Sequence, residues 1–262
     1  MSAVTGTAAG VPYIAFPPIT ARQDAPVVVA WHLLDPPRTE TAFAAAVPLD
    51  GLDAWRIYLG LPMSGSRLPE GGFAELVRLA GEDAVLNLHG PVVLGAAEEF
   101  AAAWPVLRER LGLGDGPLGV MGGSMGSAVA QFVVAEGGFQ VAAAVLISPV
   151  VDLRAVVTAL SKRYEMTYTW SPESDRLAER LDFTARSLGD TALLYVVGEE
   201  DDAAGFHEPP ARVPGARVET VAGMEHALAD EPGMEPAPQS PHAAAVDRLA
   251  VDWFSRHLVA NT

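Results

Sequence analysis

Short runs of valine, isoleucine and leucine alternate along the chain with longer, alanine-rich stretches that carry apolar residues at helical spacing. The short runs are almost continuously apolar, which is typical of parallel strands buried on both faces of a sheet. They predict strands over residues 26–34, 55–61, 118–122, 141–147, 192–198 and 217–221. Residues 11–20 are compatible with an edge strand, although Pro12, Pro17 and Pro18 have no backbone N–H to donate.

The alanine-rich stretches predict helices over residues 39–46, 96–111, 124–136, 172–187 and 241–258. The last of these is the best marked, because Ser240 is a good N-cap and Pro241 suits the first helical position. Strands that alternate with helices form mostly parallel sheets covered by helices on both faces. We therefore predict an α/β fold, and the length indicates that residues 1–262 form a single domain.

Two connections are longer than ordinary loops, and we interpret residues 62–95 and 151–190 as small lid segments. The second contains an apolar aromatic cluster made of Tyr164, Met166, Tyr168 and Trp170. Such a cluster can contact substrate or pack into the core, and the sequence favours neither interpretation over the other.

The composition excludes several kinds of site and partner. A formal net charge of −16 repels nucleic-acid phosphates and anionic membrane surfaces, so we expect neither as a partner. The chain has no cysteine, which excludes disulfides, thiolate nucleophiles and cysteine-ligated metals. The first basic residue is Arg22, unlike the start of a signal peptide, and no apolar run reaches the ~20 residues of a membrane helix. We therefore expect a soluble, cytoplasmic protein.

A glycine-rich turn follows the predicted strand 118–122 and reads Gly122-Gly123-Ser124-Met125-Gly126. A strand that runs through Gly-x-Ser-x-Gly into a helix is the context in which such a serine acts as a nucleophile. The glycines let the backbone turn sharply and present the Ser124 hydroxyl to a substrate. The Met125 amide would lie at the helix N-terminus, where it can stabilise an oxyanion. The alternative is a glycine-rich turn with an incidental serine.

In this strand, turn and helix the chain resembles the α/β-hydrolase family, whose members carry nucleophile, acid and histidine in that order along the chain. The resemblance implies an acid after the strand 192–198, where Asp201 matches the Gly-x-x-Asp pattern and Asp202 is its nearest rival. Asp152, just after the preceding strand, is a third possibility. The family places its histidine after the last strand, and of the six histidines only His226 lies in that loop.

The family usually takes a second oxyanion amide from the loop after a strand that ends in His-Gly. Here His32 is followed by Leu33, so the resemblance implies the Leu33 amide, with Leu34 as the neighbouring alternative. Leucine prefers negative φ, so the replacement changes the geometry that this loop can adopt. A His-Gly pair does occur at His89-Gly90, within segment 62–95, and we interpret it as a coincidental match or as part of a lid.

The resemblance implies a serine hydrolase that cleaves a carboxylic ester with a small or medium, uncharged acyl group through an acyl-enzyme intermediate. Single-domain esterases, prolyl-oligopeptidase-like enzymes and dienelactone-hydrolase-like enzymes share this layout. A peptidase or amidase, a thioesterase or a lactonase would use the same three residues. The missing glycine after His32 motivates an alternative of another class, a non-catalytic ligand-binding or scaffold protein.

This chemistry requires a small-molecule acyl substrate but no cofactor. A Gly-x-Gly-x-x-Gly match at residues 114–119 precedes a predicted strand instead of following one, so it does not predict a dinucleotide site. The histidines show no spacing typical of metal ligands, and we therefore expect no metal.

Overall fold

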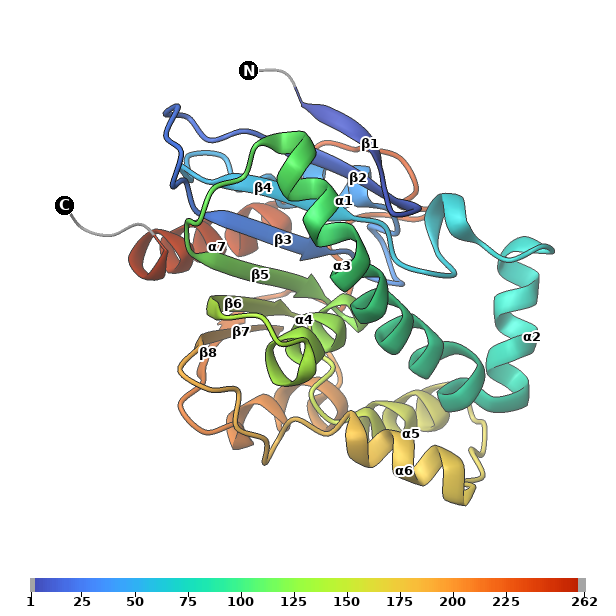
Figure 1. The fold of residues 1–262 in the computed structure, drawn as a ribbon. Helices are drawn as coiled ribbons and strands as arrows, with labels where there is room; N and C mark the ends of the chain where they lie inside the picture. The colour runs from blue at the N-terminus through green and yellow to red at the C-terminus, as the bar shows by residue number, and fades with distance from the viewer. Residues whose placement is uncertain (1–2, 259–262) are drawn as a thin grey trace.

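The computed structural model describes residues 3–258, and the eight strands in this range form one sheet in the order β1-β2-β4-β3-β5-β6-β7-β8 (Figure 1). β2 pairs antiparallel with β1 and with β4, and all other pairings in the sheet are parallel. The strands are β1 (Val4–Ala8), β2 (Val11–Phe16), β3 (Val27–Trp31), β4 (Trp55–Leu59), β5 (Leu118–Gly123), β6 (Val141–Ile147), β7 (Ala192–Gly198) and β8 (Arg217–Val221). The α/β class and the mostly parallel sheet predicted from the apolar runs are thus confirmed.

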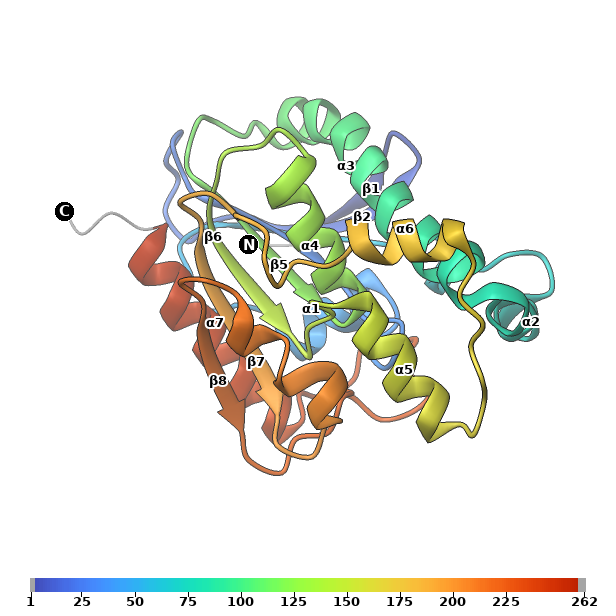
Figure 2. The same cartoon turned by 90° about the horizontal axis from the view of Figure 1, so that it is seen from below.

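Helices cover both faces of the sheet because side chains alternate along its central strands. In β3, Val27, Val29 and Trp31 pack into the apolar cluster beneath α3 and α4, whereas Val28 and Ala30 pack into the cluster beneath α1 and α7. Figure 2 shows α4 and α7 on opposite sides of the sheet. These helices are α1 (Glu40–Ala46), α3 (Gly90–Leu111), α4 (Met125–Glu136) and α7 (Pro241–His257).

The two long connections interpreted as lid segments are largely helical. Figure 1 shows their helices beyond the end of the sheet to which the parallel strands point. The first segment contains η1 (Gly65–Arg67), α2 (Gly72–Ala84) and η2 (Val85–His89), and the second contains α5 (Leu153–Arg163) and α6 (Pro172–Arg180). Two shorter turns of helix, η3 (Ala203–His207) and η4 (Pro210–Arg212), lie between β7 and β8. Neither α2 nor α5 was predicted from the sequence.

Several predicted boundaries are wrong for local reasons. The strand predicted within residues 11–20 is β2, and it is not an edge strand because β1 pairs with it. Pro12 has no N–H to donate, but its carbonyl accepts a hydrogen bond from the Gly60 amide. The helix predicted over 172–187 ends at Arg180, after which the Asp182 carboxylate accepts from the Thr184 amide and forms a turn. The helix predicted from residue 96 begins at Gly90 instead.

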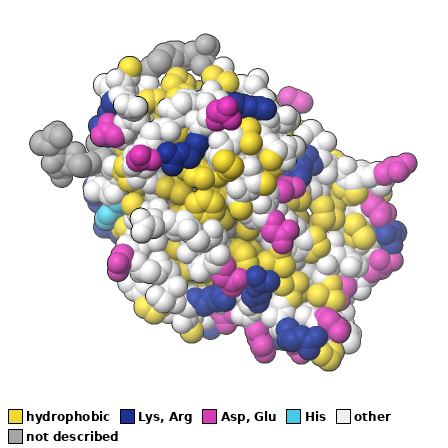
Figure 3. Space-filling view, in the orientation of Figure 1, with side chains coloured by type: hydrophobic (Ala, Val, Ile, Leu, Met, Phe, Trp, Pro, Cys, Tyr) yellow, Lys and Arg dark blue, Asp and Glu magenta, His cyan; other side chains and the backbone are white. Residues whose placement is uncertain are grey.

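Charged side chains are dispersed over the face seen in Figure 3, where acidic groups lie beside several of the basic ones. Glu136, for example, pairs with both Arg180 and Arg186 at 2.7 Å. Within residues 3–258 no helix is both long and apolar enough to cross a membrane.

Candidate active site

Ser124 lies between β5 and α4 in a backbone conformation that L residues rarely adopt, with φ 45° and ψ −118°. The chain can turn this tightly only between glycines. A Cβ on Gly122 would stand 2.1 Å from the Gly126 carbonyl oxygen, and one on Gly126 would stand 2.3 Å from that of Trp31. The Ser124 amide donates to the Ile147 carbonyl at 2.8 Å, which fixes the turn to β6. Strain of this kind is concentrated at functional sites.

Three residues far apart in the sequence form one chain of hydrogen bonds. The His226 ring lies 2.8 Å from Ser124 Oγ through Nε2 and 2.7 Å from Asp201 Oδ2 through Nδ1. An ionised carboxylate can only accept, so Nδ1 carries the proton and Nε2 is left to accept from the hydroxyl. The Asp201 side chain is 3% exposed and that of His226 is 15% exposed, so solvent competes little for these bonds.

The rival acids point elsewhere. Asp202 is the N-cap of η3, and its Oδ1 accepts from the Gly205 amide at 2.8 Å. Asp152 is the N-cap of α5 in the same way. Of the three carboxylates that the sequence left open, the structure therefore brings only Asp201 to the His226 ring.

Three further residues surround His226, and the sequence analysis missed all of them. The Asp35 carboxylate lies 3.6 Å from Nε2 and is 52% exposed. The Phe206 ring packs on the imidazole at 4.4 Å between centroids, and Ser148 Oγ donates to the His226 carbonyl at 2.8 Å. Asp35 carried a usable signal, because it follows the carboxyl end of a central parallel strand. Ser148 carried the same signal, because it directly follows β6, whereas Phe206 carried none, since its place beside His226 is set by the loop geometry.

A buried histidine holds the segment after β3. The His32 Nε2 accepts from the Leu61 amide at 3.0 Å, and Nδ1 donates to the Leu33 carbonyl at 2.6 Å. Burial lowers the pKa of His32 to about 4, so the ring is neutral at pH 7. The Leu33 side chain is fully buried, and its Cδ1 lies 2.2 Å from the place where a Cβ on Gly123 would stand.

Backbone amides beside Ser124 could bind an oxyanion. Met125 is the first residue of α4, so its N–H has no acceptor within the helix. The pocket that contains Ser124 is lined by Met125 and Leu34, whereas Leu33 is not among its lining residues. This arrangement favours Leu34 over Leu33 as the residue next to a bound carbonyl oxygen.

The pocket around Ser124 has a volume of about 780 Å³ and is open to His226 and Asp201. Tyr164 from the predicted aromatic cluster contributes to its wall, but Tyr168 and Trp170 do not. These two rings pack on each other with centroids 4.7 Å apart. The cluster is therefore divided between the site and the packing of the second lid segment.

His89 and Gly90 belong to the interface between the lid segments. The His89 side chain is 7% exposed and lines the Ser124 pocket, and its Nδ1 has no hydrogen-bond partner among the described residues. Burial lowers its pKa to about 4. A Cβ on Gly90 would stand 2.4 Å from Leu177 Cδ2 of α6, so glycine lets the two segments approach. The His-Gly pair thus lies in segment 62–95, where η2 packs against α6, and it does not follow a strand of the sheet.

The other motif singled out in the sequence is a packing feature. A Cβ on Gly114 would stand 1.7 Å from the Gln23 carbonyl oxygen, and one on Gly116 would stand 2.2 Å from that of Ala25. The glycines of this turn thus fit against the segment before β3 and not around a phosphate. Within residues 3–258 no group of three or more histidine, aspartate or glutamate side chains is arranged to hold a metal ion.

No family model and no curated protein matches the chain. Solved structures do resemble it. TT1662 from Thermus thermophilus is 18% identical over 100% of both chains, with a TM-score of 0.68. Carboxyl esterase 2 from the mycorrhizal fungus Tuber melanosporum is 17% identical over 98% of this chain and 85% of its own, with a TM-score of 0.58.

A third similar structure is a puromycin-hydrolyzing peptidase from Mycobacterium tuberculosis, which is 16% identical with a TM-score of 0.67. The match covers 98% of this chain but 39% of the peptidase. At these identities the likeness is one of fold, and any shared chemistry has to be argued from the residues.

Proposed function

The chain has the α/β-hydrolase fold, and on that premise we propose that it is a serine hydrolase of uncharged carboxylic esters. The observation that carries the proposal is the chain of hydrogen bonds from Asp201 through His226 to Ser124 Oγ. All three residues line a pocket of about 780 Å³. A nucleophile, a base and a group that orients the base are what acyl transfer requires.

The first half of the reaction forms an acyl-enzyme. His226 Nε2 takes the proton of Ser124 Oγ as the oxygen bonds to the ester carbonyl carbon. The same proton then passes to the alkoxy oxygen, the carbon–oxygen bond breaks and the alcohol leaves. Asp201 holds the ring with Nδ1 protonated and balances the positive charge that the ring acquires.

The second half reverses these proton transfers with water. His226 removes a proton from water, the hydroxyl adds to the acyl carbon, and Ser124 Oγ leaves with the proton returned to it. In both halves negative charge develops on the carbonyl oxygen, for which we assign the amides of Met125 and of Leu33 or Leu34. The lining of the pocket supports Leu34.

The charges around the pocket support a neutral substrate. Acidic side chains outnumber basic ones along its wall, and Arg38 is already paired with Glu231. A substrate carboxylate would be repelled by this surface, whereas an uncharged ester would not. The acidic lining residues are Asp35, Glu200, Asp201, Glu225, Asp230 and Glu231, and the basic ones are Arg38 and Arg163.

Labelling with a fluorophosphonate probe tests the nucleophile and separates an enzyme from a non-catalytic scaffold. We expect the folded chain to be labelled at one serine, and Ser124→Ala to abolish labelling. Ser66→Ala is the control, because Ser66 is an exposed serine that does not line the Ser124 pocket. Absence of labelling in the folded wild-type protein would refute the proposal.

A pair of neighbouring variants tests the acid. Asp201→Asn should lower kcat by about 10⁴-fold, because the amide stabilises the wrong ring tautomer and carries no charge. Asp202→Asn should leave kcat within about threefold, because asparagine is as good an N-cap as aspartate. Steady-state hydrolysis of p-nitrophenyl acetate, with circular dichroism as a check on folding, gives both values. If Asp202→Asn were inactive and Asp201→Asn remained active, the residue that orients His226 would be Asp202 instead of Asp201.

A panel of matched acyl substrates tests the bond that is cleaved. Esters, thioesters and peptide anilides that carry the same acyl group should rank with the ester first by kcat/KM, and Ser124→Ala should be inactive on all of them. A higher kcat/KM for the anilide would make the protein a peptidase with the same three residues.

A further inference from the structure

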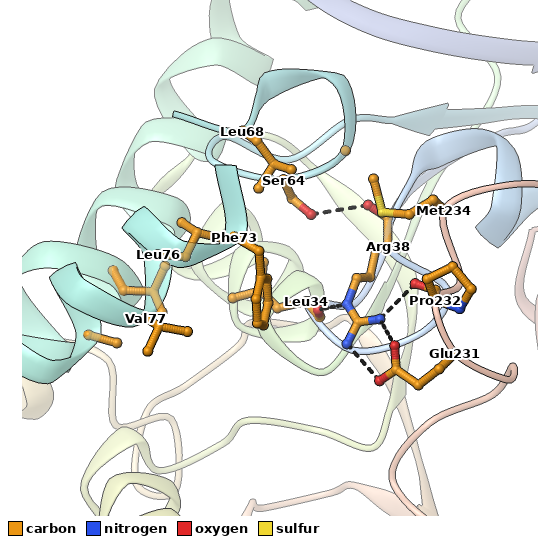
Figure 4. Close-up of a pocket in the computed structure, with 13 residues that line it drawn as sticks. Leu34, Arg38, Ser64, Leu68, Phe73, Leu76, Val77, Glu231, Pro232 and Met234 are labelled. Carbon is orange, nitrogen blue, oxygen red and sulfur yellow. Dashed lines mark hydrogen bonds and ion pairs between the residues drawn. The ribbon is translucent and has the colours of Figure 1, made fainter. Parts of the chain in front are cut away.

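A second cavity, of about 620 Å³, lies beneath α2. One face of that helix lines it, because Phe73, Leu76, Val77 and Ala80 recur at the spacing of successive helical turns. Figure 4 shows the first three of these side chains on that face. None of the side chains of α2 is fully buried, and Phe73 and Val77 are 62% and 57% exposed. An apolar helix face that the core does not cover is typical of a binding surface. We call this cavity the α2 pocket.

The α2 pocket is continuous with the pocket around Ser124. Five residues line both cavities, which are Leu34, Arg38, Phe73, Leu88 and Glu231. Leu34 belongs to the segment that we assign to the oxyanion. His226, Asp201 and Phe206 line the Ser124 pocket but not the α2 pocket. A group that extends from a carbonyl carbon into the α2 pocket therefore moves away from His226.

The polar groups of the α2 pocket are already bonded to one another. The Arg38 guanidinium donates to the Leu34 and Pro232 carbonyls at 2.9 and 2.7 Å and to the Glu231 carboxylate at 2.9 Å (Figure 4). Ser64 Oγ donates to the Arg38 carbonyl at 3.0 Å. Arg38 is the one cation among the lining residues, and Glu231 neutralises its charge. The α2 pocket therefore offers a ligand mainly apolar contact.

We propose that the α2 pocket binds an extended, unbranched acyl chain of the ester substrate. The inference rests on the proposed function and specifies its substrate class. The leaving alcohol takes its proton from His226, so it must lie beside that ring, and the acyl chain occupies the side that His226 does not line. A volume of about 620 Å³ is in the range of small-molecule pockets, and most of its lining residues are apolar.

Hydrolysis of p-nitrophenyl acetate, butyrate, hexanoate and octanoate measures the effect of chain length. Burial of each methylene contributes about fourfold in kcat/KM, so the hexanoate, with four more methylenes, should exceed the acetate by roughly 250-fold. A second series, of alkyl acetates with longer alcohols, should remain within about threefold. A flat acyl series, or a rise confined to the alcohol series, would overturn the proposal.

Two variants of α2 test the position of the chain. Val77→Asp places a charge on the face that lines the pocket, and we expect it to lower the hexanoate-to-acetate ratio at least tenfold. Ala74→Asp adds the same charge to an exposed position of α2 outside the pocket and should keep the wild-type ratio. Equal ratios in the wild type and in Val77→Asp would refute the assignment.

Direct binding separates this inference from the proposed function. Ethyl octanoate titrated into Ser124→Ala by calorimetry should bind at least tenfold more tightly than ethyl acetate, and Val77→Asp in the same background should remove the difference. If no ester is hydrolysed but this preference is found, the pocket stands and the proposed function fails. If acetate is hydrolysed and the preference is absent, the proposed function stands and the pocket assignment fails.

Discussion

His32 makes the stability of the site region depend on pH. Its ring is fully buried and neutral, and the pKa lies near 4 because burial disfavours the charged form. In the unfolded chain the pKa is about 6.5. Between these values the unfolded state binds a proton that the folded state does not, so the free energy of unfolding falls as the pH falls through 6.5 and levels off below 4. From pH 7.5 to 5 the loss is about 2 kcal/mol.

The variant His32→Gln measures this contribution. Its amide oxygen can accept from the Leu61 amide in place of Nε2 but does not titrate. Guanidinium unfolding at pH 7.5 and 5 should therefore show a loss of stability that is about 2 kcal/mol smaller in the variant than in the wild type. His89, whose pKa burial also lowers to about 4, contributes to both proteins and cancels in the difference. His257→Gln, at an exposed position, is the control and should keep the wild-type dependence.

The same pH dependence in His32→Gln and in the wild type would refute the reasoning. It would mean that the ring is already protonated in the folded state, or that it reaches solvent. A protonated Nε2 could not accept from the Leu61 amide, so the hydrogen bond at 3.0 Å would then have to be absent as well. Amide exchange at Leu61 in the wild type distinguishes these cases.

Two further predictions concern the turn and the lid segments. Gly126→Ala should lower kcat by about a hundredfold and destabilise the fold by about 1–3 kcal/mol, because the new Cβ would stand 2.3 Å from the Trp31 carbonyl oxygen. Gly95 lies within α3, and a Cβ there would have its nearest neighbour, Pro62 Cγ, at 3.6 Å. Gly95→Ala should therefore stabilise the fold by about 0.5–1 kcal/mol, and thermal melts compare this variant with Gly126→Ala. Tyr168→Phe removes the bond from Tyr168 Oη to Asp83 Oδ1 at 2.5 Å and should speed proteolysis of the first lid segment, with global stability changed by at most about 1.5 kcal/mol. Unaltered proteolysis would show that this bond does not tie the segments together.

The sequence predicted best the parts of the fold that are buried on both sides. The six predicted parallel strands are all present, and five of them are central strands whose apolar runs are easy to recognise, whereas β8 is an edge strand with one buried residue. The helix α2 was missed because none of its side chains is fully buried and its apolar residues line a cavity. The strand β1 was missed because four of its five residues are exposed, so no apolar run marks it.

The site could be predicted as far as the order of the elements determined it. The glycines around Ser124 predicted the candidate nucleophile and the family resemblance predicted His226 from its loop, but Asp201, Asp202 and Asp152 were left as rivals. Adjacent carboxylates have the same chemistry, and only the turn after β7 decides that one meets the His226 ring while the other caps η3. Asp35 was missed because its distance to His226 depends on how two loops fold toward each other.

Leu33 stands where the family usually has glycine, and from the sequence this difference predicts an altered oxyanion loop. The packing around Leu33 indicates a structural role for its side chain. The Leu33 side chain fills the space beside Gly123 that any larger residue at 123 would need. Its carbonyl is held by His32, and the His32 ring is held in turn by Leu61. The two hydrogen bonds use backbone and His32 atoms that would be present with glycine at position 33 as well, so what leucine adds to the loop is apolar packing. Because Leu33 is turned into the core, the residue left to face Ser124 is Leu34, and Leu34 is also the residue that joins the Ser124 pocket to the α2 pocket.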